Sequence, residues 1–126
     1  MIGKLGQVMV YVNDQDAARR FWTEKLGFEV IAEEDNGQGF RWIEVAPSKA
    51  AETSIVLHNK AFIAQMEPDM NLGTPSLMFV TDRLEQLHGD LADKNVKVGD
   101  IVPMPTGRVF NFADDEDNYF AVMEKL

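Results

Sequence analysis

The sequence predicts an α+β fold in which one domain, residues 1–126, is built from two βαβββ modules. The first observation is the stretch from Gln7 to Phe28, where a two-residue alternation gives way to apolar residues at helical spacing. The second is that this order returns about seventy residues later, in SLMFVTDRLEQLHGDLADKNVKV from Ser76 onward. The third is that strand-like segments follow each predicted helix. These observations predict one module used twice, over about residues 1–59 and 74–126.

The first module begins with a strand and a capped helix. The valines of QVMVYV alternate with its other residues, as in a strand with two different faces. Asp14 is predicted to cap the helix, because its carboxylate can accept hydrogen bonds from the free amide groups at a helix start. Gly27 is predicted to end the helix in the left-handed conformation. The strands that follow are predicted over 28–33, 40–46 and 53–58.

The second module repeats this order with different residues at the helix ends. Asp82 is predicted to cap the helix, and Asn95 stands where Gly27 stood in the first module. A connector over 60–73 joins the modules, and its helix-forming residues end before Pro68. The strands of this module are predicted over 76–80, 96–102, 108–113 and 119–124.

The composition limits the classes of function that are open to the chain. Its formal net charge is −9, from 21 acidic and 12 basic residues, so most of its exterior repels nucleic-acid phosphates and anionic membrane surfaces. The chain has no cysteine, which excludes disulfides, thiolate metal sites and a cysteine nucleophile. No segment is apolar over a membrane-spanning length. We therefore expect a cytoplasmic protein that binds neither nucleic acid nor a membrane.

Three stretches of the sequence carry a resemblance to a known superfamily. They are QVMVYVNDQDAARRFWTEKLGF, FRWIEVAP followed by ETSIVLH, and FADDEDNYFAVME. With the doubled βαβββ order, they resemble the vicinal oxygen chelate superfamily, which includes glyoxalase I, bleomycin-resistance proteins and extradiol dioxygenases. The resemblance covers essentially the whole chain. It implies curved mixed sheets that enclose a cleft, often completed by a second subunit, so we expect a homodimer.

The resemblance also implies where a divalent metal would be held. Family enzymes use one side chain from the first strand and one from the last strand of each module. Gln7 stands at the first of these positions, and glutamine is an accepted ligand type there. The other positions fall on Val56 (Ile55 if the register slips by one), Ser76 and Val122, and valine has no lone pair to offer a metal. We therefore expect no metal site and no cofactor.

Strand alternation predicts a cleft lined by aromatic side chains and a few polar groups. If Gln7 faces the cleft, Met9 and Tyr11 share its face. The same parity places Phe120 with Val122 in the second module. Such a lining is typical of a pocket for a small molecule. The candidate ligand-binding residues are Gln7, Met9, Tyr11, Trp42, Glu44, His58, Met78, Arg108, Phe110 and Phe120.

We favour a metal-independent protein that sequesters a small molecule in this cleft without a covalent step. An acidic pocket would suit a cationic, planar compound. The alternative is a metal-dependent lyase, isomerase or dioxygenase of the same superfamily, with a rearranged site around Gln7, His58 and a glutamate, Glu44 or Glu124. A third interpretation is an interaction module whose cleft holds no ligand. Whether the chain is an enzyme stays open at this point.

Overall fold

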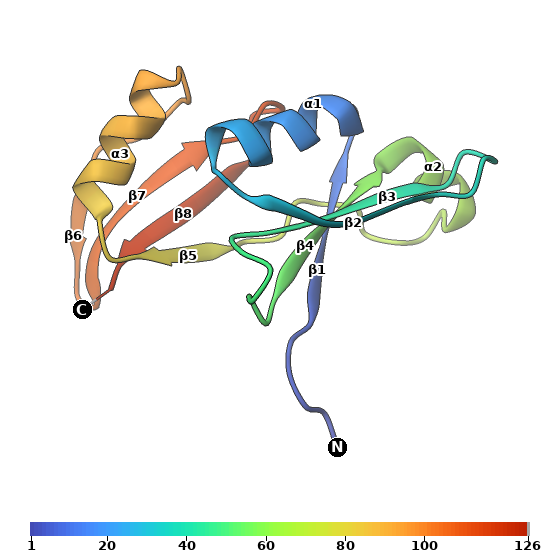
Figure 1. The fold of residues 1–126 in the computed structure, drawn as a ribbon, viewed down its shortest axis with the longest axis horizontal. Coiled ribbons are helices and arrows are strands. Elements are labelled where there is room, and N and C mark those ends of the chain that lie inside the picture. The colour runs from blue at the N-terminus through green and yellow to red at the C-terminus, as the bar shows by residue number, and fades with distance from the viewer. Residues whose placement is uncertain (126) are drawn as a thin grey trace. The chain divides into compact units, whose positions relative to one another are not determined.

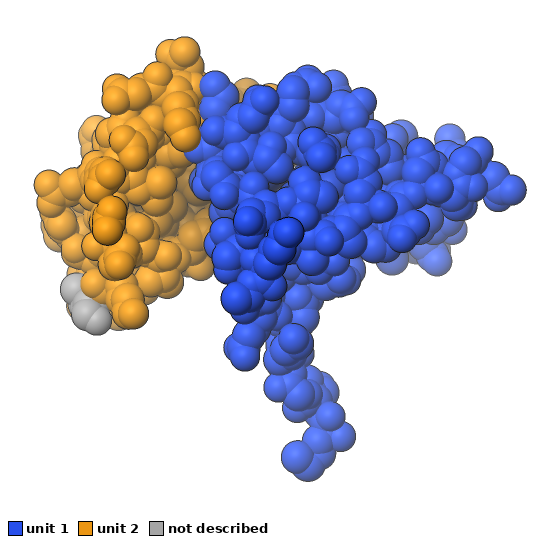
Figure 2. Space-filling model, viewed as in Figure 1, with its two compact units in different colours: residues 1–75 blue, residues 76–126 orange. Residues whose placement is uncertain are grey.

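The computed structural model describes residues 1–125 of the chain. The chain divides into two compact units, Met1–Pro75 and Ser76–Leu126 (Figure 2). Each unit contains a four-stranded mixed sheet, and helices follow the first strand of each (Figure 1). The predicted α+β class with two βαβββ modules is therefore confirmed. None of the helices in the described residues is long and apolar enough to cross a membrane.

Unit 1 has a sheet of strand order β1-β4-β3-β2 (Figure 1). Its outer strand β1 runs parallel to β4, and the other neighbours are antiparallel. The helix after β1 begins as an α-helix and continues as a π-helical turn, η1. The elements are β1 (Gln7–Val12), α1 (Gln15–Arg20), η1 (Phe21–Lys25), β2 (Glu29–Asp35), β3 (Arg41–Ala46), β4 (Ser54–Asn59) and α2 (Lys60–Met66).

The helix α1 is tied to one face of the unit 1 sheet. Gln15 is buried at the start of α1, and its Nε2 donates hydrogen bonds to the carbonyl oxygens of Leu57 (2.9 Å) and Arg41 (2.7 Å). The valines and isoleucines that alternate along β1, β3 and β4 pack on this side. The core residues here are Val10, Val12, Ala18, Trp22, Ile43, Val45, Ile55 and Leu57.

Unit 2 has the corresponding strand order β5-β8-β7-β6, with β5 parallel to β8 (Figure 1). Its core is aromatic: Phe79 lies 6.2 Å from Phe112 and 6.4 Å from Phe120, between ring centroids. Leu84 and Leu91 of α3 are buried as well. The elements are β5 (Met78–Thr81), α3 (Leu84–Asp93), β6 (Val102–Met104), β7 (Gly107–Ala113) and β8 (Tyr119–Glu124).

The predicted helix signals are confirmed in unit 1. The carboxylate of Asp14 accepts a hydrogen bond from the N–H of Ala17 at 3.0 Å, so Asp14 is the N-cap of α1. Gly27 follows the helix with a φ of 75°, in the left-handed region. In unit 2 Asn95 takes the same role with a φ of 64°. Asparagine tolerates this conformation better than most residues, which is why it can replace glycine there.

Asp82 does not cap α3, so that prediction is wrong. The N-cap residue is Arg83, and no side chain makes a capping hydrogen bond there. The hydroxyl oxygen of Thr81 accepts from the N–H of Arg83 at 3.2 Å instead. This local turn shifts the helix start by one residue and leaves Asp82 outside it.

The predicted strand over 96–102 is also wrong. The strand β6 is Val102–Met104, and the residues before it meet β7 only through an isolated bridge between Val98 and Phe112. Two backbone hydrogen bonds support that bridge, from the N–H of Gly99 to Asn111 (2.8 Å) and from that of Ala113 to Lys97 (2.9 Å). Glycine and aspartate, which follow as Gly99 and Asp100, disfavour a continuous strand.

Replacement of the two predicted cap residues gives a matched test of the helix starts. Asp14→Ala should lower the free energy of unfolding by about 1 kcal/mol, because it removes the side chain that caps α1. Asp82→Ala should change it by less than about 0.5 kcal/mol, since Asp82 caps no helix. Urea unfolding of the two variants measures both. Equal losses would contradict the assignment of the caps.

Candidate functional site

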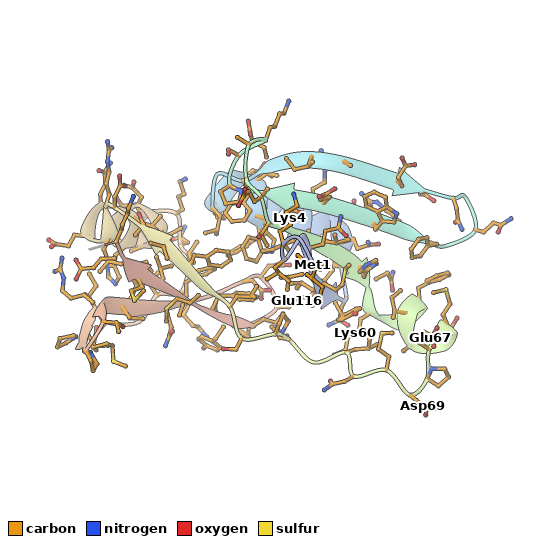
Figure 3. The ribbon with its side chains drawn as sticks, turned by 90° about the horizontal axis from the view of Figure 1, so that it is seen from below. Met1, Lys4, Lys60, Glu67, Asp69 and Glu116 are labelled. Carbon is orange, nitrogen blue, oxygen red and sulfur yellow. The ribbon has the colours of Figure 1, made fainter. Side chains whose placement is uncertain are left out.

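The face of the unit 1 sheet opposite α1 carries most of the proposed ligand-binding side chains. Strand alternation places them there, because residues two apart along a strand share a face. The register across the sheet pairs Gln7 with Ser54, Met9 with Val56, Tyr11 with His58, Glu44 with Val56 and Trp42 with His58. We call this surface the open face of unit 1. Figure 3 draws the side chains on it, with Lys4 labelled just before β1.

One part of the open face is a hollow of about 170 Å³ with an aromatic lining. It is lined by Gln7, Met9, Phe40, Trp42, Val56 and His58, and we call it the aromatic hollow. Four of these residues, namely Gln7, Met9, Trp42 and His58, are among the candidates that the sequence suggested. Because the strands β1, β4 and β3 are neighbours, residues far apart in the sequence meet in one place.

His58 of this hollow lies at the centre of a row of rings on the open face. Its imidazole is stacked on Tyr11 (5.8 Å between centroids, 22° between planes) and on Phe40 (6.0 Å, 25°). Phe40 in turn lies 5.6 Å from Phe62 of α2. The hollow therefore presents flat, apolar surfaces to whatever enters it.

The imidazole nitrogens of His58 make few polar contacts within the described residues. Nε2 lies 3.3 Å from the sulfur of Met9, and Nδ1 is buried without a hydrogen-bond partner. Burial lowers the pKa of His58 below its ordinary value of 6.5, because the imidazolium form loses hydration that no neighbour replaces. At neutral pH the ring is therefore an uncharged part of the wall.

A second hollow, of about 480 Å³, continues along the same face and is more polar. It is lined by Lys4, Gly6, Gln7, Ile31, Glu44, Ala46, Lys49, Ala51, Glu52 and Ser54, and we call it the polar hollow. Gln7 lines both hollows. Glu44 is half-buried, and its Oε2 accepts a hydrogen bond from the hydroxyl of Ser54 at 2.6 Å. A charge-assisted bond of this length holds the carboxylate in a fixed position.

The predicted site residues of unit 2 have different surroundings. Phe110 and Phe120 are buried, and Phe110 packs edge-on against His88 of α3 at 4.9 Å between centroids. The strand parity that placed Phe120 and Val122 on an open face is therefore wrong, because both point to the core beneath α3. The opposite face of β8 carries Ala121, which pairs with the exposed Met78.

Arg108 is held near the start of β7 by carboxylates. Its Nε and Nη2 donate to Glu124 at 3.0 Å each, and its Nη1 donates to Glu85 at 2.9 Å. These contacts raise the pKa of the Arg108 guanidinium and lower that of the Glu124 carboxyl. These bonds join α3 to the sheet of unit 2, and they give Arg108 a structural role.

The positions implied for a divalent metal do not offer a suitable donor set. Val56 is buried and aliphatic, and Val122 is buried in the core of unit 2. Glu44, which pairs with Val56 across the sheet, has its Oε2 bonded to the hydroxyl of Ser54. Among residues 1–125 no group of three or more histidine, aspartate or glutamate side chains is placed to hold a metal ion. We derive no chemical step through a metal.

A family model for the Glyoxalase/Bleomycin resistance protein/Dioxygenase superfamily matches residues 4–122. The chain therefore belongs to this superfamily, as the resemblance of the sequence suggested. The match covers both units and so both halves of the doubled module. A fold of this kind supports several unrelated activities, so membership alone does not define a function.

Particular relatives cover the chain from end to end. The uncharacterized protein YetH of Bacillus subtilis (strain 168) is 34% identical over 125 residues, which are 98% of this chain and 100% of YetH. TnmS3 from Streptomyces sp. CB03234, whose crystal structure is described as that of an antibiotic binding protein, is 30% identical in sequence to this chain. The two structures superpose with a TM-score of 0.84, over 99% of this chain and 98% of the TnmS3 chain. A glyoxalase/bleomycin resistance protein from the same strain is 30% identical with a TM-score of 0.76, over 95% and 99% of the two chains.

Sequence reasoning missed Phe40, Phe62 and Ser54. Phe40 lies two residues before Trp42, so strand parity was a signal for it. Ser54 had a similar signal, because it alternates with Val56 and His58. Phe62 lies on α2, and its approach to Phe40 depends on how the chain turns after β4, which no local pattern specifies.

The shifted pKa of His58 predicts a pH dependence of stability. Because the folded pKa lies below the unfolded one, the unfolded state binds more protons in the window below about 6.5, and stability falls as the pH drops through it. His58→Phe and His58→Gln remove this contribution. Between about pH 7.5 and pH 5 the wild type should therefore lose more unfolding free energy than either variant. Urea midpoints at both pH values measure this, and an equal loss in all three proteins would contradict it.

Proposed function

We propose that this protein binds a small aromatic molecule non-covalently, without a metal, in the aromatic hollow of unit 1. The observation that carries the proposal is the row of rings formed by Tyr11, His58 and Phe40, with Trp42 beside it in the same hollow. Flat rings on a rigid sheet can stack on a planar ligand with little loss of conformational freedom. Sequestration of the ligand, rather than its conversion, is the function that this wall supports.

The composition of the wall also supports a binding role. Met9 lies in the hollow, and the sulfur of Met70 lies 3.7 Å from the hydroxyl of Tyr11. Methionine side chains adapt their shape to different apolar partners. Rigid aromatic rings beside flexible methionine side chains suit a binding protein that accepts related compounds. TnmS3, a relative at 30% identity over nearly its whole length, is described as an antibiotic binding protein. This description supports a small-molecule ligand for the present chain.

Thermal unfolding in the presence of planar aromatic compounds tests the proposal. Compounds that bind only the folded protein must raise its melting temperature. We expect some planar aromatic compounds to raise the melting temperature, and to do so equally in excess EDTA. Trp42→Ala should weaken their affinity at least about tenfold, which corresponds to roughly 1.4 kcal/mol of binding free energy.

Two further variants make this experiment specific. Trp42→Phe keeps a ring in the hollow and should restore most of the affinity. Met66→Ala removes an exposed apolar side chain of α2 outside the lining of the hollow and should leave the affinity unchanged. A library in which no aromatic compound raises the melting temperature would contradict the proposed function. Binding that EDTA abolishes would contradict its metal independence.

We further propose that the protein works in the cytoplasm as a homodimer. The cysteine-free composition supports the first statement. The second is supported by the face of the unit 2 sheet opposite α3, where Met78, Val80 and Tyr119 are 54%, 59% and 55% exposed. Val102 and Met104 extend the same apolar face. Exposed apolar faces of this kind usually contact a partner.

Sedimentation of the protein at micromolar concentration tests the dimer. We expect a species of twice the chain mass, and Val80→Glu should shift it toward the monomer by placing a charge on the apolar face. Asp93→Lys, an exposed charge change at the end of α3, serves as the control and should leave the mass unchanged. A single species of 14.2 kDa in the wild type would contradict the dimer.

A further inference from the structure

The open face of unit 1 places a fixed carboxylate beside the aromatic hollow. Trp42 and Glu44 are two residues apart on β3 and share its face. This separation is about 7 Å along a strand. Gln7, which lines both hollows, connects the aromatic part of the surface to the polar part. A ligand whose ring stacks on Trp42 can therefore extend a short substituent along β3 toward Glu44.

We propose that the ligand is a planar aromatic amine, whose ring stacks in the aromatic hollow and whose ammonium group pairs with the carboxylate of Glu44. This inference rests on the proposed function and adds the chemical class of the ligand. The carboxylate of Glu44 binds Ser54 through Oε2 alone among the described residues. Its other oxygen remains available to accept from a ligand. A half-buried carboxylate discriminates strongly between a cation and an anion, because little water screens it.

The charges of the polar hollow support an amine rather than an acid. Lys4 and Lys49 also line this hollow, and Glu52 completes a balanced set of two cations and two anions. Both lysines and Glu52 are exposed, so water screens them and their positions adjust. Glu44 is half-buried and anchored, and it alone of the four lies on the strand that carries Trp42. On this face of β3, the charged side chain next to Trp42 is therefore negative.

Among the described residues, no lysine or arginine lines the aromatic hollow. His58 is the titratable side chain that faces it from β4, and it is uncharged at neutral pH. From β1 the neighbouring side chains are Met9 and Tyr11, and from β3 Trp42. An anionic substituent placed here would approach the half-buried carboxylate of Glu44, and the two exposed lysines of the polar hollow are screened by water, so binding would be weaker.

Three naphthalene compounds with the same ring system test the inference by calorimetric titration at about 0.15 M salt. They are 1-naphthylmethylamine, 1-naphthalenemethanol and 1-naphthoate, which carry an ammonium, a hydroxyl and a carboxylate. The wild type should bind the amine at least about tenfold more tightly than the carboxylate, with the alcohol between them. Glu44→Gln keeps the shape of the side chain and should remove the advantage of the amine. Ser54→Ala should reduce that advantage, because it releases Glu44 from its anchor.

The control is Glu52→Gln, which changes the net charge by the same amount within the same hollow. It should retain the preference of the wild type, and this separates Glu44 from the general attraction of an acidic chain for cations. Equal binding of all three compounds, or an unchanged preference in Glu44→Gln, would overturn the inference and leave the proposed function standing. Failure of all three compounds to bind would overturn the inference as well, and the proposed function would fall with it only if the thermal-unfolding library also gave no aromatic ligand.

Discussion

A sheet that packs against a helix on one side forms its main core on that side, and this constraint shapes unit 1. The side-chain amide of Gln15 binds the carbonyl oxygens of Leu57 and Arg41, which ties α1 to β4 and β3. One set of alternating residues then forms the core under the helix. The other set, offset by one residue along each strand, lines the open face. The position of α1 therefore decides which side chains are available for a ligand.

The same constraint explains how far the sequence could predict the site. Alternation along β1 placed Gln7, Met9 and Tyr11 on one face, and the structure places Gln7 and Met9 in the aromatic hollow. In unit 2 the alternation of Phe120 and Val122 was equally visible. It was assigned to the wrong side of the sheet, because both faces of β8 carry apolar residues and α3 chooses between them. A periodic pattern gives the phase of a strand, but the tertiary contact decides which phase is the core.

Local signals behaved in a similar way at the helix ends. Asp14 and Asp82 are both acidic residues before a helix, and only Asp14 caps one. The difference lies in Thr81, whose hydroxyl accepts from Arg83 and starts α3 one residue later. The aromatic hollow also depends on Phe62 of α2, which meets Phe40 after the chain has turned at Asn59. Neither feature follows from composition, because each depends on a competing hydrogen bond or a long-range packing contact.

In unit 1, the surface where the superfamily resemblance implies metal ligands carries other chemistry. Val56 is aliphatic, Glu44 is engaged by Ser54, and His58 is stacked between rings with its Nε2 against the sulfur of Met9. These residues form an apolar wall with one anchored carboxylate at its edge. In the account proposed here, that wall holds a planar ligand by stacking, and the carboxylate selects its charge. The binding surfaces are already ordered in the free protein, so little conformational entropy is lost on association.

The most direct test of this account is an amide and indole N–H spectrum of the protein, recorded by NMR with 1-naphthylmethylamine in excess EDTA. The indole N–H of Trp42, the side-chain amide of Gln7 and the backbone of β1, β3 and β4 should shift. The indole of Trp22, which is buried on the other face of the same sheet, should shift far less and serves as the internal control. Shifts that avoid Trp42, or that appear only when a divalent metal replaces EDTA, would contradict a metal-independent aromatic site on the open face of unit 1.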